Sequence, residues 1–439
     1  MLKYIPNFKN TVFQYRKNIL YYLLLSGLMF LLLRPGVHVA SPIRIGLMFL
    51  ALLPAFSRPE YLPFCMTCIV GISSNAFYDI LPTSPGYYLI IILLLYVNYK
   101  KRSGFFLNAF GIYSVFLLFS LAHGDFPVFL TWGLIAVILA DFIKTRSDFG
   151  NLVIAFMIAS FIPSLLFLMY QDFFNVDYGS MDEGLQRAYW MNTNRFGAAI
   201  AAGGVMAVAY ISGLLNVTRT ESLRILSIIT IVLAIPTLVL NASRGAIFAF
   251  IIPSLIVFLL SEVKTVYKLT SFAIIALVLY HLYARTDMFE LLIARMQDDT
   301  FETGGDRTTI WENKLSKFLE YDFATQFVGI GRSACVRLAG YMSTHNDFLT
   351  AFIGYGYFGL FLFSILIAFP FIKAPKRSKK AVFVLSLYIV IECFVLEPIF
   401  RGYLFFLMFY IFTLKYALLE RKKYKKELAV RNSLRSNKY

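Results

Sequence analysis

The chain has few charged residues for its length. Asp, Glu, Lys and Arg make up 15% of its 439 residues, whereas soluble domains contain about 25%. This deficit excludes an ordinary water-soluble globular domain. Hydrophobic residues make up 59% and aromatic residues 17%, and apolar runs of about 17–25 residues, long enough to cross a hydrocarbon core, recur along the chain. The composition therefore predicts an integral membrane protein, a single domain over residues 1–439.

Several motifs for metal, nucleotide and redox chemistry are missing. The sequence has no HExxH motif, no Walker loop and no Rossmann glycine pattern after a strand, so it gives no sign of a zinc protease site or of nucleotide binding. Cys65 and Cys68 form a CxxC pair in an apolar segment without a second ligand pair, and we interpret them as small packing residues. We expect neither a metal ion nor another cofactor.

Acidic residues are outnumbered by basic ones, 25 to 41, which gives a net charge of +16. Such an excess can indicate nucleic-acid binding, but the positions of the basic residues argue against it. Most lie in short segments at alternate turns, such as Lys100-Lys101-Arg102, and in the tail 420–439. This positive-inside pattern predicts that these segments and both termini are cytoplasmic. The tail itself is expected to be a frayed helix end or disordered.

The apolar runs predict an all-α, polytopic membrane helix bundle with fourteen spans. Pro54, Pro59 and Pro63 interrupt the second and third of these runs, so a single re-entrant or surface hairpin there would reduce the number to twelve. Both numbers are even, and the predicted side of every later loop is the same. The expected spans are 18–34, 42–57, 59–78, 86–99, 104–122, 127–143, 149–170, 195–215, 223–241, 245–262, 266–284, 347–372, 381–396 and 402–419.

This arrangement places mixed-charge segments on the outer face. They are the loop 171–194, the turn 241–244, the long loop 285–346 with its short helices, and residues 397–401. Polar backbone of this kind must lie outside the bilayer, because lipid cannot satisfy exposed N–H and C=O groups. An outer loop that contains Arg, His, Asp and Trp indicates a protein that handles a charged ligand at the membrane surface.

Two arginines lie at the outer ends of predicted spans. Arg195 follows Asn194, and the small residues of 197–204 favour close helix packing, which would hold Arg195 inside the bundle; the alternative is an arginine that snorkels to the interface. Arg244 lies in a short Asn-Ala-Ser-Arg-Gly turn. A turn of this composition is typical of an anion-binding corner, with an interfacial anchor as the alternative.

The long loop supplies further candidates. Arg307 precedes Trp311 by four residues, so a helix over 306–320 would place the two side chains on one face; a solvated loop arginine is the alternative. Arg332, after Gly329-Ile330-Gly331, is a weaker candidate of the same kind.

The loop ends in His345, Asn346 and Asp347. A lone outer histidine beside an aspartate is a natural general base. The glycines of 354–359, just beyond, are expected to permit close packing. Glu397 is expected to pair with Arg401.

The order of these elements resembles the O-antigen polymerase and O-antigen ligase family, over residues 190–360. That family is helical, usually with twelve spans and a large periplasmic loop. The elements that carry the resemblance are Asn192-Thr193-Asn194-Arg195, Ser243-Arg244-Gly245, Asp306-Arg307 with Trp311, Gly329-Ile330-Gly331, and His345-Asn346.

The resemblance implies a metal-independent glycosyltransferase of the bacterial inner membrane, whose donor is an oligosaccharide on undecaprenyl diphosphate. It implies diphosphate binding by Arg195, Arg244 and Arg307, because arginine binds phosphate oxygens in pairs. It also implies that His345 orients or deprotonates the acceptor hydroxyl. Asn194, Trp311, Arg332, Asn346 and Asp347 are secondary candidates.

The resemblance leaves the acceptor open between two main alternatives, and the family also has relatives that glycosylate proteins or make other surface polysaccharides. A polymerase transfers the glycan to another lipid-linked repeat unit, whereas a ligase transfers it to lipid A–core. Ligases often have a second histidine before the His-Asn pair, where this chain has Ser343-Thr344, which favours the polymerase. A chain-length regulator and a flippase of the same pathway would be its protein partners. The rival class is a lipid-linked oligosaccharide transporter, for which Glu392, deep in a predicted span, is the main indication.

Overall fold

The computed structural model describes residues 13, 15–25, 41–76, 128–169, 193–241, 243–262, 264–266, 307–340, 343–400 and 404–436, with single positions between 273 and 293. The described residues are 86% helical and include no strand, which confirms the predicted all-α class. The elements are α2 Ser41–Ser57, η2 Pro59–Tyr61, α3 Leu62–Ala76, α6 Val128–Asp141, α7 Arg146–Met169, α9 Thr193–Ile211, α10 Glu221–Asn241, α11 Arg244–Leu260, α14 Arg307–Leu319, α15 Phe323–Val328, α16 Arg332–Arg337, α17 Asp347–Lys373, η5 Lys376–Ser378, α18 Lys379–Val395 and α19 Leu404–Ser436.

Four of the described helices are long and apolar enough to cross a membrane. They are α7, residues Asn194–Ile211 of α9, α10 and α17, and α11 is a shorter apolar helix. These helices coincide with predicted spans, and they indicate a membrane protein. The predicted spans 86–99 and 104–122, and most of 266–284, lie outside the described residues.

The proline-rich pair at 42–78 folds as two helices. The short turn η2 separates α2 from α3, and Pro59 begins that turn. Leu62 to Val70 of α3 are buried, and α3 packs mainly against α7. Helix α3 therefore lies inside the bundle.

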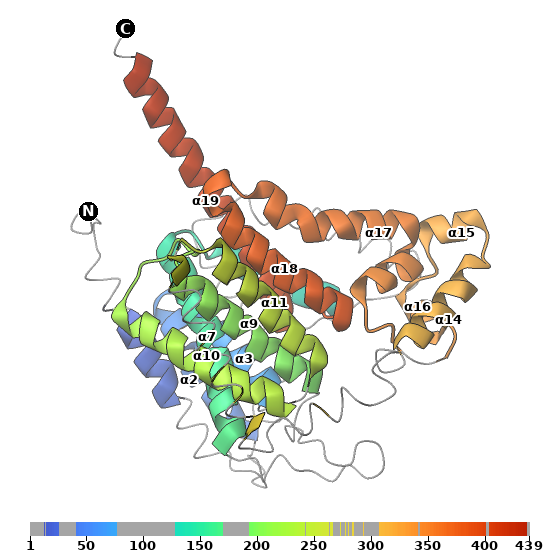
Figure 1. Ribbon diagram of the computed structural model, residues 1–439, viewed down its shortest axis with the longest axis horizontal. Helices are drawn as coiled ribbons and strands as arrows, with labels where there is room; N and C mark the ends of the chain where they lie inside the picture. The colour runs from blue at the N-terminus through green and yellow to red at the C-terminus, as the bar shows by residue number, and fades with distance from the viewer. Residues whose placement is uncertain are drawn as a thin grey trace.

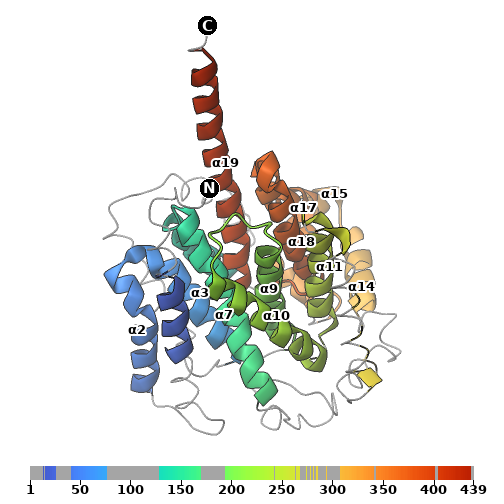
Figure 2. The ribbon, with the colours of Figure 1, turned by 60° about the vertical axis from the view of Figure 1, so that its left-hand side comes forward.

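Helix α9 lies at the centre of the bundle, with α2 and α3 on one side and α14 and α15 on the other (Figure 2). It packs against α7, α10, α11 and α18. A Cβ added at Gly197 would lie 2.6 Å from the Cβ of Ala246, and the Ser160 hydroxyl of α7 donates to the Ile200 carbonyl at 3.0 Å. The close packing predicted for the small residues 197–204 is confirmed.

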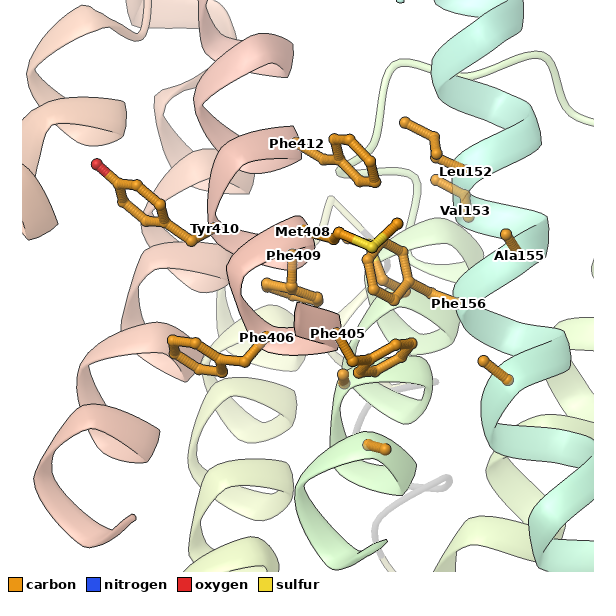
Figure 3. Close-up of a cluster of buried hydrophobic side chains, with 14 of the residues drawn as sticks. Leu152, Val153, Ala155, Phe156, Phe405, Phe406, Met408, Phe409, Tyr410 and Phe412 are labelled. Carbon is orange, nitrogen blue, oxygen red and sulfur yellow. The ribbon is translucent and has the colours of Figure 1, made fainter. Parts of the chain in front are cut away.

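Aromatic side chains join α19 to α7. The ring of Phe156 lies edge-on to Phe405 and Phe409, with centroid distances of 5.0 and 5.2 Å (Figure 3). On another side of α19, the Tyr410 hydroxyl donates to the Leu366 carbonyl of α17 at 2.6 Å. Because lipid is as apolar as these side chains, their contribution to helix association comes from van der Waals contact and edge-to-face ring geometry.

Charged residues gather at one end of the bundle, which we call the tail end. The carboxylate of Glu420 is buried there and accepts hydrogen bonds from Arg146 at 2.6 Å and Asn216 at 3.2 Å. Arg377 forms an ion pair with the same carboxylate at 3.4 Å. Three segments far apart in the sequence are thereby fixed to α19.

The C-terminal part of helix α19 projects from the bundle (Figure 1). The structure keeps it helical as far as Ser436, so of the two predicted alternatives, a helix end or a disordered tail, this stretch is a helix end. Glu427 explains part of this outcome, because it pairs with Arg377 at 2.6 Å and with Lys423, four residues before it, at 3.8 Å.

The helices alternate in direction between the tail end and the opposite end, which we call the site end. Helices α7, α10 and α18 finish at the site end, whereas α9, α11, α17 and α19 begin there, as the contacts described below show. Short helix α14 also begins at the site end. Four residues predicted to lie on the outer face are found in or beside the first turns of these helices. They are therefore at one end of the molecule: Arg195, Arg244, Arg307 and Asp347.

Candidate functional site

The starts of α9 and α11 are joined by a side-chain hydrogen bond. The Ser243 hydroxyl donates to Oδ1 of Asn194 at 2.9 Å. Ser243 is the N-cap residue of α11 but makes no side-chain capping bond, since its hydroxyl is directed to α9 instead. Arg195 and Arg244, each the next residue in sequence, are partly buried. The structure thus brings the first two predicted arginines onto adjoining helix starts.

Arg307 reaches the end of α18 from the long loop. It is the first residue of α14, and its Nη1 donates to the Val395 carbonyl at 2.8 Å. The Val395 side chain also lies against the start of α11, because a Cβ added at Gly245 would be 2.8 Å from Cγ2 of Val395. Val395 therefore links the segment of Arg307 to that of Arg244.

Trp311 lies one turn along α14 and contacts the neighbouring residue of α18. Its ring is edge-on to Phe394, with centroids 5.6 Å apart, and its Nε1 donates to the Thr344 carbonyl at 2.6 Å. The helix predicted over 306–320 is observed as Arg307–Leu319. Trp311 thus connects α18 to the residue that precedes His345.

His345 occupies a left-handed backbone conformation, with φ of 51°. Its backbone N–H donates to the Ser343 hydroxyl at 3.4 Å. A left-handed conformation costs a residue other than glycine about 1–2 kcal/mol, so the surrounding contacts must hold it. Asn346 supplies one of them, because its Oδ1 caps α17 by accepting from the Leu349 N–H at 3.0 Å.

Asp347 has a structural role. Its carboxylate is fully buried and accepts from the backbone N–H groups of Ile399 at 2.9 Å and Phe400 at 3.1 Å. These bonds attach the turn after α18 to the start of α17. Asp347, a secondary candidate in the sequence, thus bonds to the backbone of the turn 394–400.

Glu397 is a site residue whose main contacts sequence reasoning missed. Its φ is 60° and its side chain is buried. One carboxylate oxygen accepts from the Ser343 hydroxyl, and the other accepts from Thr350 Oγ1 at 2.8 Å. Arg401, its predicted partner, lies outside the described residues. The Glu-Pro step directly after an apolar run was the available signal, since a proline there indicates that the helix ends at about this residue.

The turn 394–400 is therefore the centre of the site end. It contacts α11 and α14 through Val395, α14 through Phe394, and α17 through Glu397, Ile399 and Phe400. Figure 1 shows the end of α18 beside α14 and the start of α17. Five of the described helices, α9, α11, α14, α17 and α19, begin at the site end, and each helix start carries a partial positive charge of about half a unit.

Arg332 lies elsewhere, at a sharp bend of α17 around Gly356, which we call the elbow. Gly356 has φ of 70°, and the Gly331 N–H donates to the Gly354 carbonyl at 2.9 Å. A Cβ at Gly354 would be 3.6 Å from the backbone of Arg332. The predicted close packing of these glycines is confirmed, but it places Arg332 against the elbow and not against the turn 394–400.

Lys314 and Cys335 stabilise the long loop. The ammonium of Lys314 is buried and donates to the carbonyls of Cys335, Val336 and Leu338 at 2.7, 3.0 and 2.5 Å, which closes the end of α16. Burial lowers the pKa of Lys314. Burial also raises the pKa of the Cys335 thiol to about 12, so this thiol stays protonated and unreactive at neutral pH.

The arrangement can attract and orient an anion. Arg244 and Arg307 lie on helix starts that both contact Val395, and Arg195 lies on the start of α9, which the Ser243–Asn194 hydrogen bond joins to the start of α11. His345 is connected to the same turn through Ser343 and Glu397. In the part of the chain that the structure describes, no group of three or more His, Cys, Asp or Glu residues is placed to hold a metal ion. No known protein family matches the chain, and no characterised protein matches it either.

Proposed function

We propose that the protein is a membrane glycosyltransferase that polymerises surface polysaccharide, and that its donor is an oligosaccharide on undecaprenyl diphosphate. In this proposal the chain crosses the bacterial inner membrane with 12–14 helices and keeps both termini in the cytoplasm. The site end and the long loop 285–346 face the periplasm. The observation that supports the proposal is that the helix starts of Arg244 and Arg307 and the His345 segment contact the turn 394–400, with the helix start of Arg195 joined to that of Arg244.

Charge at the leaving group supports this chemistry. In the proposed step, a sugar hydroxyl attacks the anomeric carbon of the donor, a new glycosidic C–O bond forms, and the bond from that carbon to the diphosphate oxygen breaks. The diphosphate leaves with the bonding electrons, so negative charge grows on its oxygens. Arg195, Arg244 and Arg307 neutralise that charge, and the positive ends of α9, α11 and α14 add to their field.

The hydroxyl proton passes to the imidazole of His345. Histidine has an unperturbed pKa near neutrality, which suits a general base at ordinary pH. The Ser343 hydroxyl links the His345 N–H to Glu397, and Asn346 caps the helix that follows. These contacts fix the backbone of His345 before substrate binds, and such preorganisation lowers the entropy cost of the reaction.

Arg307 is preorganised in a similar way. A guanidinium has five N–H donors in one plane, and the bond from Nη1 to Val395 fixes the orientation of that plane. A bidentate contact with a phosphate depends on such orientation. Replacement by lysine would keep the charge but lose the planar geometry.

A genetic and biochemical experiment tests the proposal. The gene is deleted in its host and replaced by Arg244→Ala, Arg307→Ala or His345→Ala, and surface polysaccharide is separated on a gel. Each variant should give the deletion phenotype at a protein level equal to wild type. Arg337→Ala is the matched control, because Arg337 is exposed at the end of α16 and should leave the polysaccharide unchanged. Wild-type polysaccharide from all three variants would refute the catalytic assignment.

The same gel distinguishes the acceptors. A single repeat unit on core in the deletion strain indicates a polymerase, whereas bare core with long lipid-linked chains indicates a ligase. An unchanged ladder would refute both. Glu392, buried in α18, supports the transporter alternative, which predicts that Glu392→Gln blocks the appearance of lipid-linked oligosaccharide on the outer face.

A further inference from the structure

The short helix α15 exposes large apolar side chains. Phe323 is 73% exposed, Phe327 46% and Val328 42%, and Leu319 and Tyr321 just before the helix are 48% and 43% exposed. We call these residues the α15 apolar face. The rings of Phe323 and Phe327 lie beside each other, with centroids 6.2 Å apart. Five exposed apolar side chains within ten residues are costly in water, so this face requires an apolar environment.

The α15 apolar face adjoins the elbow of α17. The ring of Phe327 stacks on Phe358, with centroids 6.1 Å apart and an interplanar angle of 29°. The backbone of Phe327 also fills the space over Gly356, where an added Cβ would overlap the Phe327 carbonyl. In Figure 1, α15 lies at the far end of the long arm of α17. Helix α15 is therefore held rigidly at this point of α17.

Helix α17 continues the exposed apolar surface beyond the elbow. It is one of the helices able to cross a membrane. Tyr357, Phe361 and Ile365, spaced four residues apart, are 43, 60 and 41% exposed. Side chains at this spacing form one stripe along a helix, and on a membrane-spanning helix such a stripe faces lipid. The α15 apolar face extends this stripe at its end.

Polar groups show that α15 cannot lie in the hydrocarbon core. A helix of six residues leaves most of its backbone N–H and C=O groups outside intrahelical bonds, and lipid cannot satisfy them. Glu320 and Asp322 at its start are exposed. The Asp322 carboxylate is ionised at neutral pH, as an exposed aspartate ordinarily is, and hydrogen bonds from the backbone and side chain of Thr325 lower its pKa further. An ionised carboxylate at this position requires contact with water.

We propose that α15 is an interfacial membrane anchor. It lies at the headgroup boundary of the membrane that α17 crosses, with Phe323 and Phe327 inserted among the acyl chains and Glu320 and Asp322 in the aqueous headgroup layer. Aromatic side chains prefer this boundary. The anchor fixes the height of α14, α15 and α16 relative to the bilayer. The proposal uses none of the residues assigned to glycosyl transfer, so it stands or falls separately.

Lipid-dependent quenching tests the anchor. The native cysteines Cys65, Cys68, Cys335 and Cys393 are buried, so a new surface cysteine can be labelled selectively with a fluorophore sensitive to polarity. Phe323→Cys carries the probe on α15, and Ser316→Cys carries it on the exposed face of α14. Each full-length variant is reconstituted into nanodiscs of phosphatidylcholine, with or without a spin label near the headgroup end of the acyl chain. Gel filtration confirms that each variant is monodisperse.

The two probes should behave differently. At position 323 we expect blue-shifted emission and at least about two-fold stronger quenching by the spin-labelled lipid than at position 316, because an interfacial helix buries its apolar face among the acyl chains. Aqueous iodide should quench the probe at 316 more strongly. Equal quenching of both probes by lipid and by iodide would overturn the proposal, as would iodide quenching of position 323 like that of a free peptide. Ala324→Cys, also on α15, provides a second labelling site.

Discussion

Replacement of Glu397 by alanine should loosen the site end as a whole. The side chain of Glu397 accepts hydrogen bonds from Ser343 and Thr350. Ser343 lies two residues before His345, and Thr350 lies five residues after it, in α17. Without the carboxylate, the Ser343 hydroxyl loses its partner in the turn 394–400. The Thr350 hydroxyl is less affected, because it also lies 2.5 Å from Thr344 Oγ1.

The magnitude follows from these contacts. A partly or fully buried polar group that loses its partner costs about 1–3 kcal/mol, and one such loss together with a weakened second bond gives about 2–4 kcal/mol. Glu397→Gln should cost about 1 kcal/mol or less, since its amide keeps an acceptor for one hydroxyl and offers a donor to the other. Glu397 has φ of 60°, but alanine retains that strain, so no gain offsets the loss.

Thermal unfolding in detergent with a thiol-reactive dye measures this effect. The four cysteines are buried and react only as the protein opens, so dye reaction reports unfolding of the native bundle. Glu397→Ala should unfold at a clearly lower temperature than Glu397→Gln and wild type, and should lose transfer activity. Glu312→Ala removes an exposed carboxylate from α14 and is the matched control. If Glu397→Ala unfolds and functions like Glu312→Ala, the turn 394–400 does not organise the site end.

Three other predictions follow from single contacts. Lys314→Met should lower the unfolding temperature, because three carbonyls lose a charged donor. A hydrogen bond from a charged group contributes about 1.5–3 kcal/mol. Lys317→Met, on the exposed face of the same helix, should leave the unfolding temperature unchanged. Gly356→Ala should also destabilise the protein, by about 1–3 kcal/mol from its positive φ alone and more from overlap with Phe327, as measured in the same dye assay. Arg244→Lys should reduce transfer by about ten-fold or more while leaving the unfolding temperature unchanged, because lysine lacks the planar fork; equal activity would show that Arg244 acts only as a point charge.

Local patterns predicted much of the helical framework. The small residues 197–204 pack closely on α7 and α11, as expected from their size, and the four-residue spacing of Arg307 and Trp311 lies on a helix. Such features depend on neighbours in sequence, whose geometry a helix fixes. Membrane topology likewise depends on hydropathy along short stretches.

Long-range contacts could not be predicted from the same patterns. Glu397 bonds to Ser343 across 54 residues, and Asp347 bonds to Ile399 across 52. The sequence pattern indicated only a local partner, Arg401, for Glu397, and it indicated no long-range partner for Asp347. The burial of Lys314 could not be predicted either, because a lysine in a polar loop is usually solvated and its burial depends on carbonyls at the end of α16, which only the folded loop brings together.

The central claim is that the site end binds a diphosphate with Arg195, Arg244 and Arg307. A cryo-electron-microscopy structure of the full-length protein in nanodiscs with undecaprenyl diphosphate tests it most directly. We expect density for the diphosphate in contact with all three guanidiniums beside the turn 394–400, within reach of His345. Density at the tail end near Glu420, or a bound diphosphate that touches none of the three arginines, would contradict it.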